Sequence, residues 1–306
     1  MHVTFLTPLG SAFALTALVL VAVWLVRVRD LRRVRAALGL EEPSLRTLLV
    51  PVVALAAVPC LLGVAATQPV IETNRTMPER TDAQAFVVMD ISRSMLASKS
   101  PGSADRLDRA RHIAEKVADE LPDLPIGLAG FTDRVLPYLF PTTDRRVIDA
   151  TLEDAVDIEQ PPPSDVYTNE ATNLNALASV AQLNYFTPAA KKRVVIVMTD
   201  GESQPVESSL GPPFQKPPRV ETIYVKIGDG GERIYTGGIP EAAYKPSSQA
   251  GADLARAASL TGGKVFDESQ VGQIVGAVRN AIGQGPTVQK RHEGGRRPLM
   301  PYITAL

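Results

Sequence analysis

The first part of the chain carries two long, uncharged apolar runs that predict membrane helices. One runs from Pro8 to Val26 and the other from Thr47 to Ala66. At a rise of about 1.5 Å per residue, each run is long enough to cross the hydrocarbon core of a bilayer as a helix. Pro51 and Pro59 lie within the second run, and membrane helices tolerate proline. Residues 1–66 are therefore expected to form a membrane anchor.

The charges around these runs predict an orientation. Residues 27–46, between the runs, contain six arginines against Asp30, Glu41 and Glu42. Such an arginine-rich loop is expected in the cytoplasm, which places everything after Ala66 outside it. A cleaved signal peptide fits poorly, because no lysine or arginine precedes the first run and no small-residue cleavage site follows it. The chain is expected to be a multi-pass protein of the cell membrane with an extracytoplasmic domain.

After the anchor, short apolar runs alternate with amphipathic stretches. Residues 67–84 are polar and are expected to form a linker, and residues 85–284 a soluble domain. The pattern predicts strands at 86–89, 126–131, 135–139, 193–199, 220–227 and 264–266, and helices at 105–120, 145–155, 173–185, 249–260 and 270–283. Near-continuous apolar strands that alternate with helices favour a doubly wound α/β domain with a parallel sheet covered on both faces.

Three further segments show no clear periodicity. Residues 203–218 are rich in proline and are expected to be irregular, and residues 228–248 are expected to form a loop or hairpin. Residues 285–306 form a basic tail that turns apolar at Leu299. The eight residues from Leu299 to Leu306 cannot span a bilayer alone. They either begin a third membrane helix or end a two-span chain.

Composition removes several classes of function. A net charge of −1 gives no electrostatic case for nucleic-acid binding. The single cysteine, Cys60, lies inside an apolar run, and the three histidines are scattered. Disulfides, cysteine–histidine zinc sites and cysteine catalysis are therefore not expected.

Oxygen-bearing side chains gather where predicted strands end. Asp90, Ser92 and Ser94 follow the strand 86–89, Thr172 begins a predicted helix, and Asp200 follows the strand 193–199. In open α/β sheets, ligands bind at the carboxyl edge of the strands. A set of hydroxyls with few carboxylates suits a hard divalent cation such as Mg²⁺, with Mn²⁺ as a second candidate.

Each of these residues alone has a simpler interpretation. A serine or threonine near a helix start is often a cap, and Asp90 could be an isolated buried carboxylate. Glu202, beside Asp200, is expected to be an exposed loop acid. A haloacid-dehalogenase-like phosphatase also has an aspartate after its first strand, but it needs a general acid where this chain has Ser92. The domain is accordingly not expected to be an enzyme.

The combination of motifs resembles a known site. Asp-x-Ser-x-Ser at 90–94, Thr172 before a helix, and Thr-Asp-Gly at 199–201 are similar to the metal-ion-dependent adhesion site of von Willebrand factor type A domains. The resemblance implies a Rossmann-like fold with a mostly parallel sheet. It also implies Mg²⁺ ligation by the hydroxyls of Ser92, Ser94 and Thr172, with the two aspartates bound directly or through water. The sixth coordination position would take water or a carboxylate from a protein partner.

The whole arrangement resembles the Bat-type (aerotolerance-operon) membrane proteins, which often carry a third span. That resemblance implies partners such as other von Willebrand type A membrane proteins, or a MoxR-type AAA+ ATPase that meets residues 27–46 in the cytoplasm. The expected function is metal-dependent protein–protein interaction. The alternative is a membrane-anchored assembly scaffold in which the metal is only structural.

Overall fold

The structure, a computed structural model, describes residues 2–39, 44–72, 75–164, 172–292, 296–299 and 301. It divides into two compact units. One comprises Met1–Thr76 with Arg291–Leu306, and the other comprises Met77–Lys290. The run from Leu299 to Leu306, considered above as the start of a third membrane helix, lies largely outside the described residues.

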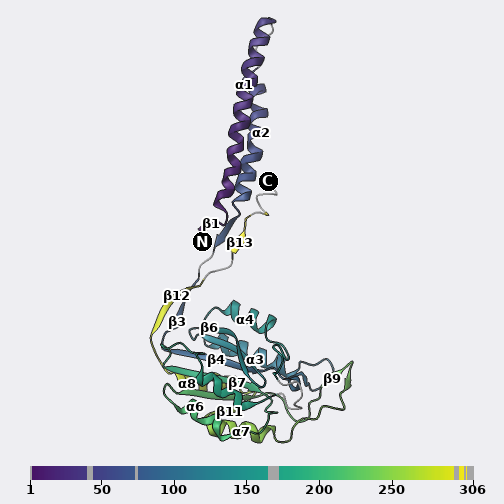
Figure 1. The fold of residues 1–306 in the computed structure, drawn as a ribbon, viewed down its shortest axis with the longest axis vertical. Helices are drawn as coiled ribbons and strands as arrows, with labels where there is room; N and C mark the ends of the chain where they lie inside the picture. The colour runs from purple at the N-terminus through teal and green to yellow at the C-terminus, as the bar shows by residue number, and fades with distance from the viewer. Residues whose placement is uncertain are drawn as a thin grey trace. The chain divides into compact units, whose positions relative to one another are not determined.

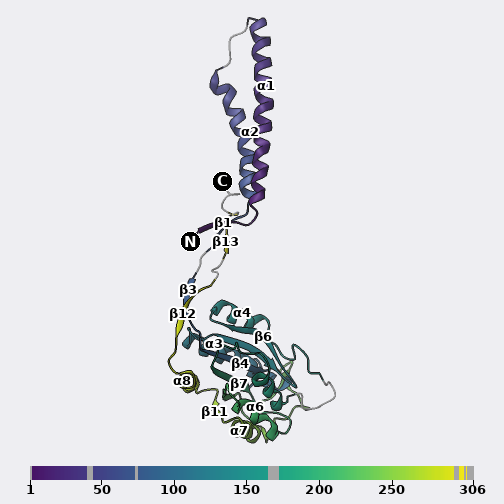
Figure 2. The same ribbon diagram turned by 60° about the vertical axis from the view of Figure 1, so that its left-hand side comes forward.

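The first unit contains the two predicted apolar helices. It is built from strand β1 (His2–Phe5), 3₁₀ helix η1 (Pro8–Leu15) and helices α1 (Thr16–Ala37) and α2 (Leu45–Ala66). In both ribbon views α1 and α2 run side by side (Figure 1, Figure 2). The helical segments Pro8–Arg35 and Leu49–Ala66 are long and apolar enough to cross a membrane. Because their large apolar side chains are mostly exposed, this unit needs apolar surroundings.

The helix boundaries in this unit differ from the prediction. Residues 8–15 form a 3₁₀ helix, and α1 continues through the arginine-rich segment to Ala37, so the prediction of a loop from residue 27 is wrong for residues 27–37. Arginine, leucine and alanine are strong helix formers, and the first residue that breaks the pattern is Gly39, with φ of +67°. Pro51 and Pro59 lie inside α2, which bends in Figure 2.

The predicted linker and tail are not irregular. Within the first unit, strand β2 (Pro69–Glu72) pairs with β1 and with β13 (Arg296–Pro298). Strand β3 (Arg75–Arg80) pairs with β12 (Thr287–His292). These segments are polar and their partners lie far away in sequence: Glu79 and Lys290, 211 positions apart, form an ion pair of 2.8 Å. Strands β2 and β3 thus lie within the expected linker, residues 67–84, and local periodicity does not reveal pairing over such long sequence separations.

The second unit is organised around a six-stranded sheet of order β11-β8-β7-β4-β5-β6. Its strands are β4 (Ala83–Asp90), β5 (Ile126–Phe131), β6 (Val135–Thr142), β7 (Lys192–Thr199), β8 (Val220–Lys226) and β11 (Lys264–Asp267). All neighbouring strands are parallel except β5 and β6. The predicted doubly wound, mostly parallel sheet is therefore confirmed.

Helices cover both faces of this sheet (Figure 1). Helices α3 (Arg106–Glu120), α4 (Arg145–Asp154) and α8 (Val271–Ile282) share one apolar core with the sheet. The other core is formed with η3 (Leu174–Leu177), α5 (Ala178–Gln182), η4 (Ser208–Leu210), α6 (Gly211–Gln215) and α7 (Ala250–Thr261). Along β4 the side chains alternate: Val87 and Met89 enter the first core, and Phe86 and Val88 enter the second. Burial on both faces explains the unbroken apolar run.

Some irregular segments carry more structure than predicted. The expected helix 173–185 is two short helices, η3 and α5. The proline-rich stretch 203–218 contains η4 and α6, and α6 tolerates its prolines because they lie in the first turn. Residues 228–248 contain a small hairpin of β9 (Tyr235–Thr236) and β10 (Ile239–Pro240), in agreement with the loop-or-hairpin prediction.

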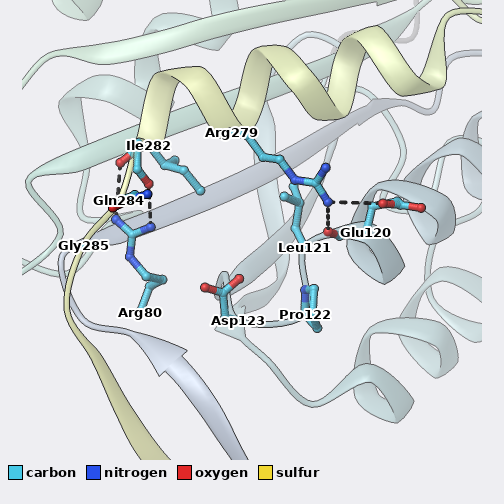
Figure 3. A pocket seen from close by; sticks show the side chains of 10 residues that line it. Arg80, Glu120, Leu121, Pro122, Asp123, Arg279, Ile282, Gln284 and Gly285 are labelled. Carbon is cyan, nitrogen blue, oxygen red and sulfur yellow. Dashed lines mark hydrogen bonds and ion pairs between the residues drawn. The ribbon is translucent and has the colours of Figure 1, made fainter.

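A pocket of about 510 Å³ lies beside the carboxyl ends of α3 and α8 (Figure 3). Three of its charged lining residues, Arg80, Glu120 and Arg279, have partners within the domain. Arg279 bonds the carbonyl and carboxylate of Glu120, and Arg80 bonds Asp82 and the carbonyl of Gly283. Because Arg80 precedes β4, the pocket lies at the amino edge of the sheet, opposite the oxygen-rich carboxyl edge.

Candidate metal centre

The oxygen-bearing residues meet at the carboxyl edge of the two central strands. β4 and β7 are neighbours, with Met89 paired to Met198, so Asp90 and Asp200 follow adjacent strand ends. β4 is followed in the chain by β5 on one side, whereas β7 and β8 lie on its other side. The strand order therefore reverses at β4, and ligands of doubly wound sheets bind at such a point.

Asp90 is a fully buried carboxylate held by hydrogen bonds from neutral donors. The backbone N–H of Ser92 donates to its Oδ1 over 3.0 Å, and the hydroxyl of Thr199 donates to its Oδ2 over 2.6 Å. Among the described residues, no lysine, arginine or histidine forms an ion pair with Asp90. Burial and the charge of Asp200 raise the pKa of Asp90 to about 7. An additional cation would compensate this carboxylate.

The serine hydroxyls are not used as helix caps. The Oγ atoms of Ser92 and Ser94 lie 3.0 Å apart. Ser92 precedes the 3₁₀ helix η2 (Arg93–Leu96), yet its side chain makes no capping hydrogen bond. The simpler interpretation of Ser92 as a cap is therefore wrong. Its hydroxyl faces that of Ser94, next to the buried Asp90.

Thr172 lies against the loop that carries Asp200. It is 3% exposed, and its carbonyl accepts the N–H of Gln204 over 2.9 Å. The cap of the following helix η3 is Asn173, whose side-chain oxygen accepts the N–H of Asn175. Thr172 was interpreted as the first residue of that helix, and the structure places it one residue before the cap.

Asp200 has a partner that the sequence did not reveal. The N–H of Glu202 donates to its Oδ1 over 2.8 Å, and the Nη1 of Arg106 donates to its Oδ2 over 2.7 Å. The side chains of Arg106 and Asp200 are each 2% exposed. Helical spacing places Arg106 on the same face of α3 as the buried Ala110 and Ile113, so its burial could have been predicted, but the local pattern does not name its partner.

Two neighbours complete the site. Thr199 was noticed only as part of a motif, but its hydroxyl links Asp90 to the N–H of Gly201, which donates to it over 3.0 Å. Glu202 was expected to be exposed; its side chain is 16% exposed and accepts hydrogen bonds from Tyr244 and Arg106. Burial and the charge of Asp200 raise the pKa of Glu202. Gly201, with φ of +84°, allows the chain to turn tightly after Asp200.

The donor set fits a hard cation. Within the described ranges, no three His, Cys, Asp or Glu side chains gather as a metal site, so a bound metal would depend on hydroxyl oxygens. Ser92 and Ser94 supply two such oxygens beside the uncompensated Asp90. Hydroxyls with few carboxylates are a set that Mg²⁺ and Mn²⁺ accept and that zinc or copper would not prefer.

Comparison with known proteins agrees with this geometry. Residues 85–202 match the model of the von Willebrand factor type A domain. The fold is similar to that of an aerotolerance-related membrane protein from Bacteroides fragilis, at TM-score 0.51 and 19% identity, over 65% of this chain and 98% of that one. BatB from Bacteroides thetaiotaomicron matches at TM-score 0.53 and 19% identity, over 66% of this chain and 100% of that one.

A weaker likeness, at TM-score 0.41 and 18% identity, is to mussel proximal thread matrix protein 1 with a zinc-occupied MIDAS motif; it covers 66% of this chain and 48% of that one. A search of curated proteins found no significant match. The fold of the second unit and the matched residues agree with the motif at 90–94. The chain therefore carries a von Willebrand factor type A domain, and its fold is similar to that of Bat-type aerotolerance-related proteins.

Proposed function

We propose that this domain binds Mg²⁺ or Mn²⁺ and uses it to bind a partner protein, without catalysing a reaction. Ser92, Ser94 and Thr172 would hold the cation through their hydroxyls, with Asp90 and Asp200 supplying negative charge. The observation that carries the proposal is the buried Asp90, which has no cationic partner in the described chain and lies beside two hydroxyls that cap no helix.

The cation would bind the partner, and the protein would hold the groups that bind the cation. When bound, the cation supplies a Lewis-acidic position that accepts a carboxylate oxygen. The protein holds the carboxylate of Asp90 in place with hydrogen bonds from the hydroxyl of Thr199 and the backbone N–H of Ser92. The hydroxyls of Ser92 and Ser94 lie next to each other in the segment that follows. A protein partner presenting an aspartate or glutamate side chain fits this chemistry, because a carboxylate is a hard oxygen ligand.

The location proposed for the domain is outside the cytoplasm, anchored by α1 and α2 in the cell membrane. The arginines at 27, 29, 32, 33 and 35 lie on the helical continuation of α1, which supports a cytoplasmic position for that end. That end is also the part of the chain that a MoxR-type ATPase could meet, whereas other von Willebrand type A membrane proteins could meet the domain.

Protease added outside intact spheroplasts should cut the domain; protection there would contradict this orientation.

The central test is calorimetric titration of Mg²⁺ and Mn²⁺ into the full chain in non-ionic detergent. Wild type should bind saturably, and Ser92→Ala should lose at least about tenfold in affinity because one coordinating oxygen is gone. Ser103→Ala is the matched control, since the hydroxyl of Ser103 bonds the backbone of Ser100 in an exposed turn. A folded wild type that binds neither ion would disprove the proposal.

The scaffold alternative makes a different prediction for the same variant. If the metal is only structural, Ser92→Ala should lower the thermal stability measured with Mg²⁺ present and leave partner binding intact. If the metal is the binding group, Ser92→Ala should stay folded and lose the partners that wild type captures with Mg²⁺ and releases with chelator. The wild-type and variant captures are compared side by side.

A further inference from the structure

Arg106 is a buried positive charge at a site proposed to hold a cation. Its side chain is 2% exposed, and its Nη1 lies 2.7 Å from Oδ2 of Asp200 and 3.3 Å from the carbonyl oxygen of Ser94. Two positive charges close together repel each other strongly in a buried site. A cation site next to Arg106 therefore requires that the charge of Arg106 already be balanced by the protein.

The arrangement around Asp200 shows how this balance is achieved. Both oxygens of its carboxylate accept hydrogen bonds from the protein, Oδ1 from the N–H of Glu202 and Oδ2 from Arg106. A charge-assisted bond of 2.7 Å between buried groups is a strong interaction. Asp90, by contrast, accepts bonds only from neutral donors among the described residues. The two aspartates that the motif treats alike thus differ in how much charge they leave for a metal.

The domain builds a fixed position for this guanidinium. Its Nε donates to Glu232 over 2.8 Å, and its Nη2 donates to the carbonyl of Asp229 over 3.0 Å. Gly228, with φ of +77°, leaves the space in which Arg106 and Glu232 meet: a Cβ there would lie 2.5 Å from the Nε of Arg106. Arg106 also donates its backbone N–H to the carbonyl of Ala97, beyond η2.

We propose that Arg106 is a positioning residue that offsets part of the charge of Asp200, so that Asp90 supplies most of the negative charge facing the bound divalent cation. This inference rests on the proposed function above. The bound cation then keeps a net positive charge toward the open side of the site. The metal is therefore held less tightly than two free aspartates would hold it. An incoming carboxylate of a partner is in turn attracted more strongly to the metal.

The test is a double-mutant cycle on Mn²⁺ binding by the full chain in detergent, with free Mn²⁺ followed by EPR. Arg106→Gln should tighten Mn²⁺ binding by about tenfold, because Asp200 is left as a free charge near the ion. Asp200→Asn should weaken it by at least about tenfold, because one of the carboxylates that offset Arg106 is removed and only Glu202 and Glu232 remain as its charged partners. The double variant Arg106→Gln/Asp200→Asn should return to within about threefold of wild type, since the pair is again neutral.

Two controls separate charge from structure. Arg106→Lys keeps the charge and should stay within about threefold of wild type. Arg109→Gln removes a charge from the same cluster, because Arg109 bonds Glu232 and Glu268, but the residue makes no described contact with Asp200. It should also leave Mn²⁺ affinity within about threefold of wild type. Metal-free thermal unfolding, recorded for every variant, gives a second measurement that does not involve the ion.

Two results would contradict the proposed role of Arg106. If Asp200 is a direct ligand of the metal, the double variant will bind as weakly as Asp200→Asn, and the proposal is wrong. If Arg106 only supports the fold, Arg106→Gln will bind more weakly than wild type, which also overturns it. If Arg106→Gln fails to fold because Glu232 loses a partner, the cycle is repeated with Glu232→Gln in every chain. A wild type that binds no Mn²⁺ refutes the proposed function instead.

Discussion

Replacing Asp90 with asparagine is expected to stabilise the metal-free protein at pH 8 while abolishing its binding of Mg²⁺. Asp90 is fully buried and has no cationic partner among the described residues, so its ionised form is costly. Asparagine has nearly the same shape without the charge. The free energy of unfolding should rise by about 1–3 kcal/mol in chelator, after allowing about 1 kcal/mol for a poorer hydrogen bond with Thr199 or Ser92.

The increase in the free energy of unfolding caused by Asp90→Asn should grow as the pH rises. In the fold the pKa of Asp90 is raised from 3.8 to about 7, chiefly by burial and then by the charge of Asp200. Between these values the folded protein keeps a proton that the unfolded chain has released. The stability of the metal-free wild type therefore falls as pH rises from about 4 to about 7. Asp90→Asn should remove that loss, so its advantage should be largest at pH 8 and clearly smaller at pH 5.

Chemical unfolding at both pH values, in detergent with chelator, measures this difference. Asp108→Asn is the control, because Asp108 is 52% exposed and its ion pair with Arg111 is of the surface kind. That variant should change the free energy of unfolding by less than about 1 kcal/mol at either pH. An Asp90→Asn protein less stable than wild type at pH 8 would mean that the charge of Asp90 is balanced in the folded protein by something other than a metal.

Truncating Phe86 to alanine should lower the free energy of unfolding by about 3–5 kcal/mol, the range for large aromatic side chains in closed cores. Phe86 is fully buried in the centre of β4, with its ring centroid 5.3 Å from that of Tyr185 and 5.4 Å from that of Phe186. Its ring also occupies the space beside Gly127, where a Cβ would collide with it. The cavity would be bounded by strands on both sides, which limits its collapse.

The matched control is Phe140→Ala, because Phe140 lies on the edge strand β6 and is 60% exposed. Its removal should cost less than about 1 kcal/mol. Urea unfolding of the full chain in detergent, followed by circular dichroism, compares the two variants. Equal losses would show that the aromatic cluster around Phe86 is not the centre of the second core.

Much of the sheet could be predicted because its signal is local. β4 and β7 are buried on both faces, so each appears in the sequence as an unbroken apolar run that ends in a polar residue. The same strand ends placed Asp90 and Asp200 at one edge. Ser92 and Ser94 followed from their position two and four residues after Asp90.

The contacts that escaped prediction join residues that are far apart in the chain. Arg106 reaches Asp200 across 94 positions and Glu232 across 126, and neither residue has a local pattern that announces its partner. Helical periodicity places Arg106 on the buried face of α3, in register with Ala110 and Ile113, but it gives no partner for the charge. β3 and β12 escaped prediction for the same reason, because a polar strand whose partner lies far away in sequence shows no apolar alternation.

The two edge strands of the sheet affect whether neighbouring copies of the chain can pair through their sheets. A sheet edge is a template for another chain, and proteins held in a membrane meet one another at high local concentration. Here one edge, β6, carries Pro137 and Pro141, each of which removes a backbone donor. The other, β11, is only four residues long. Neighbouring copies are thereby discouraged from joining sheet to sheet.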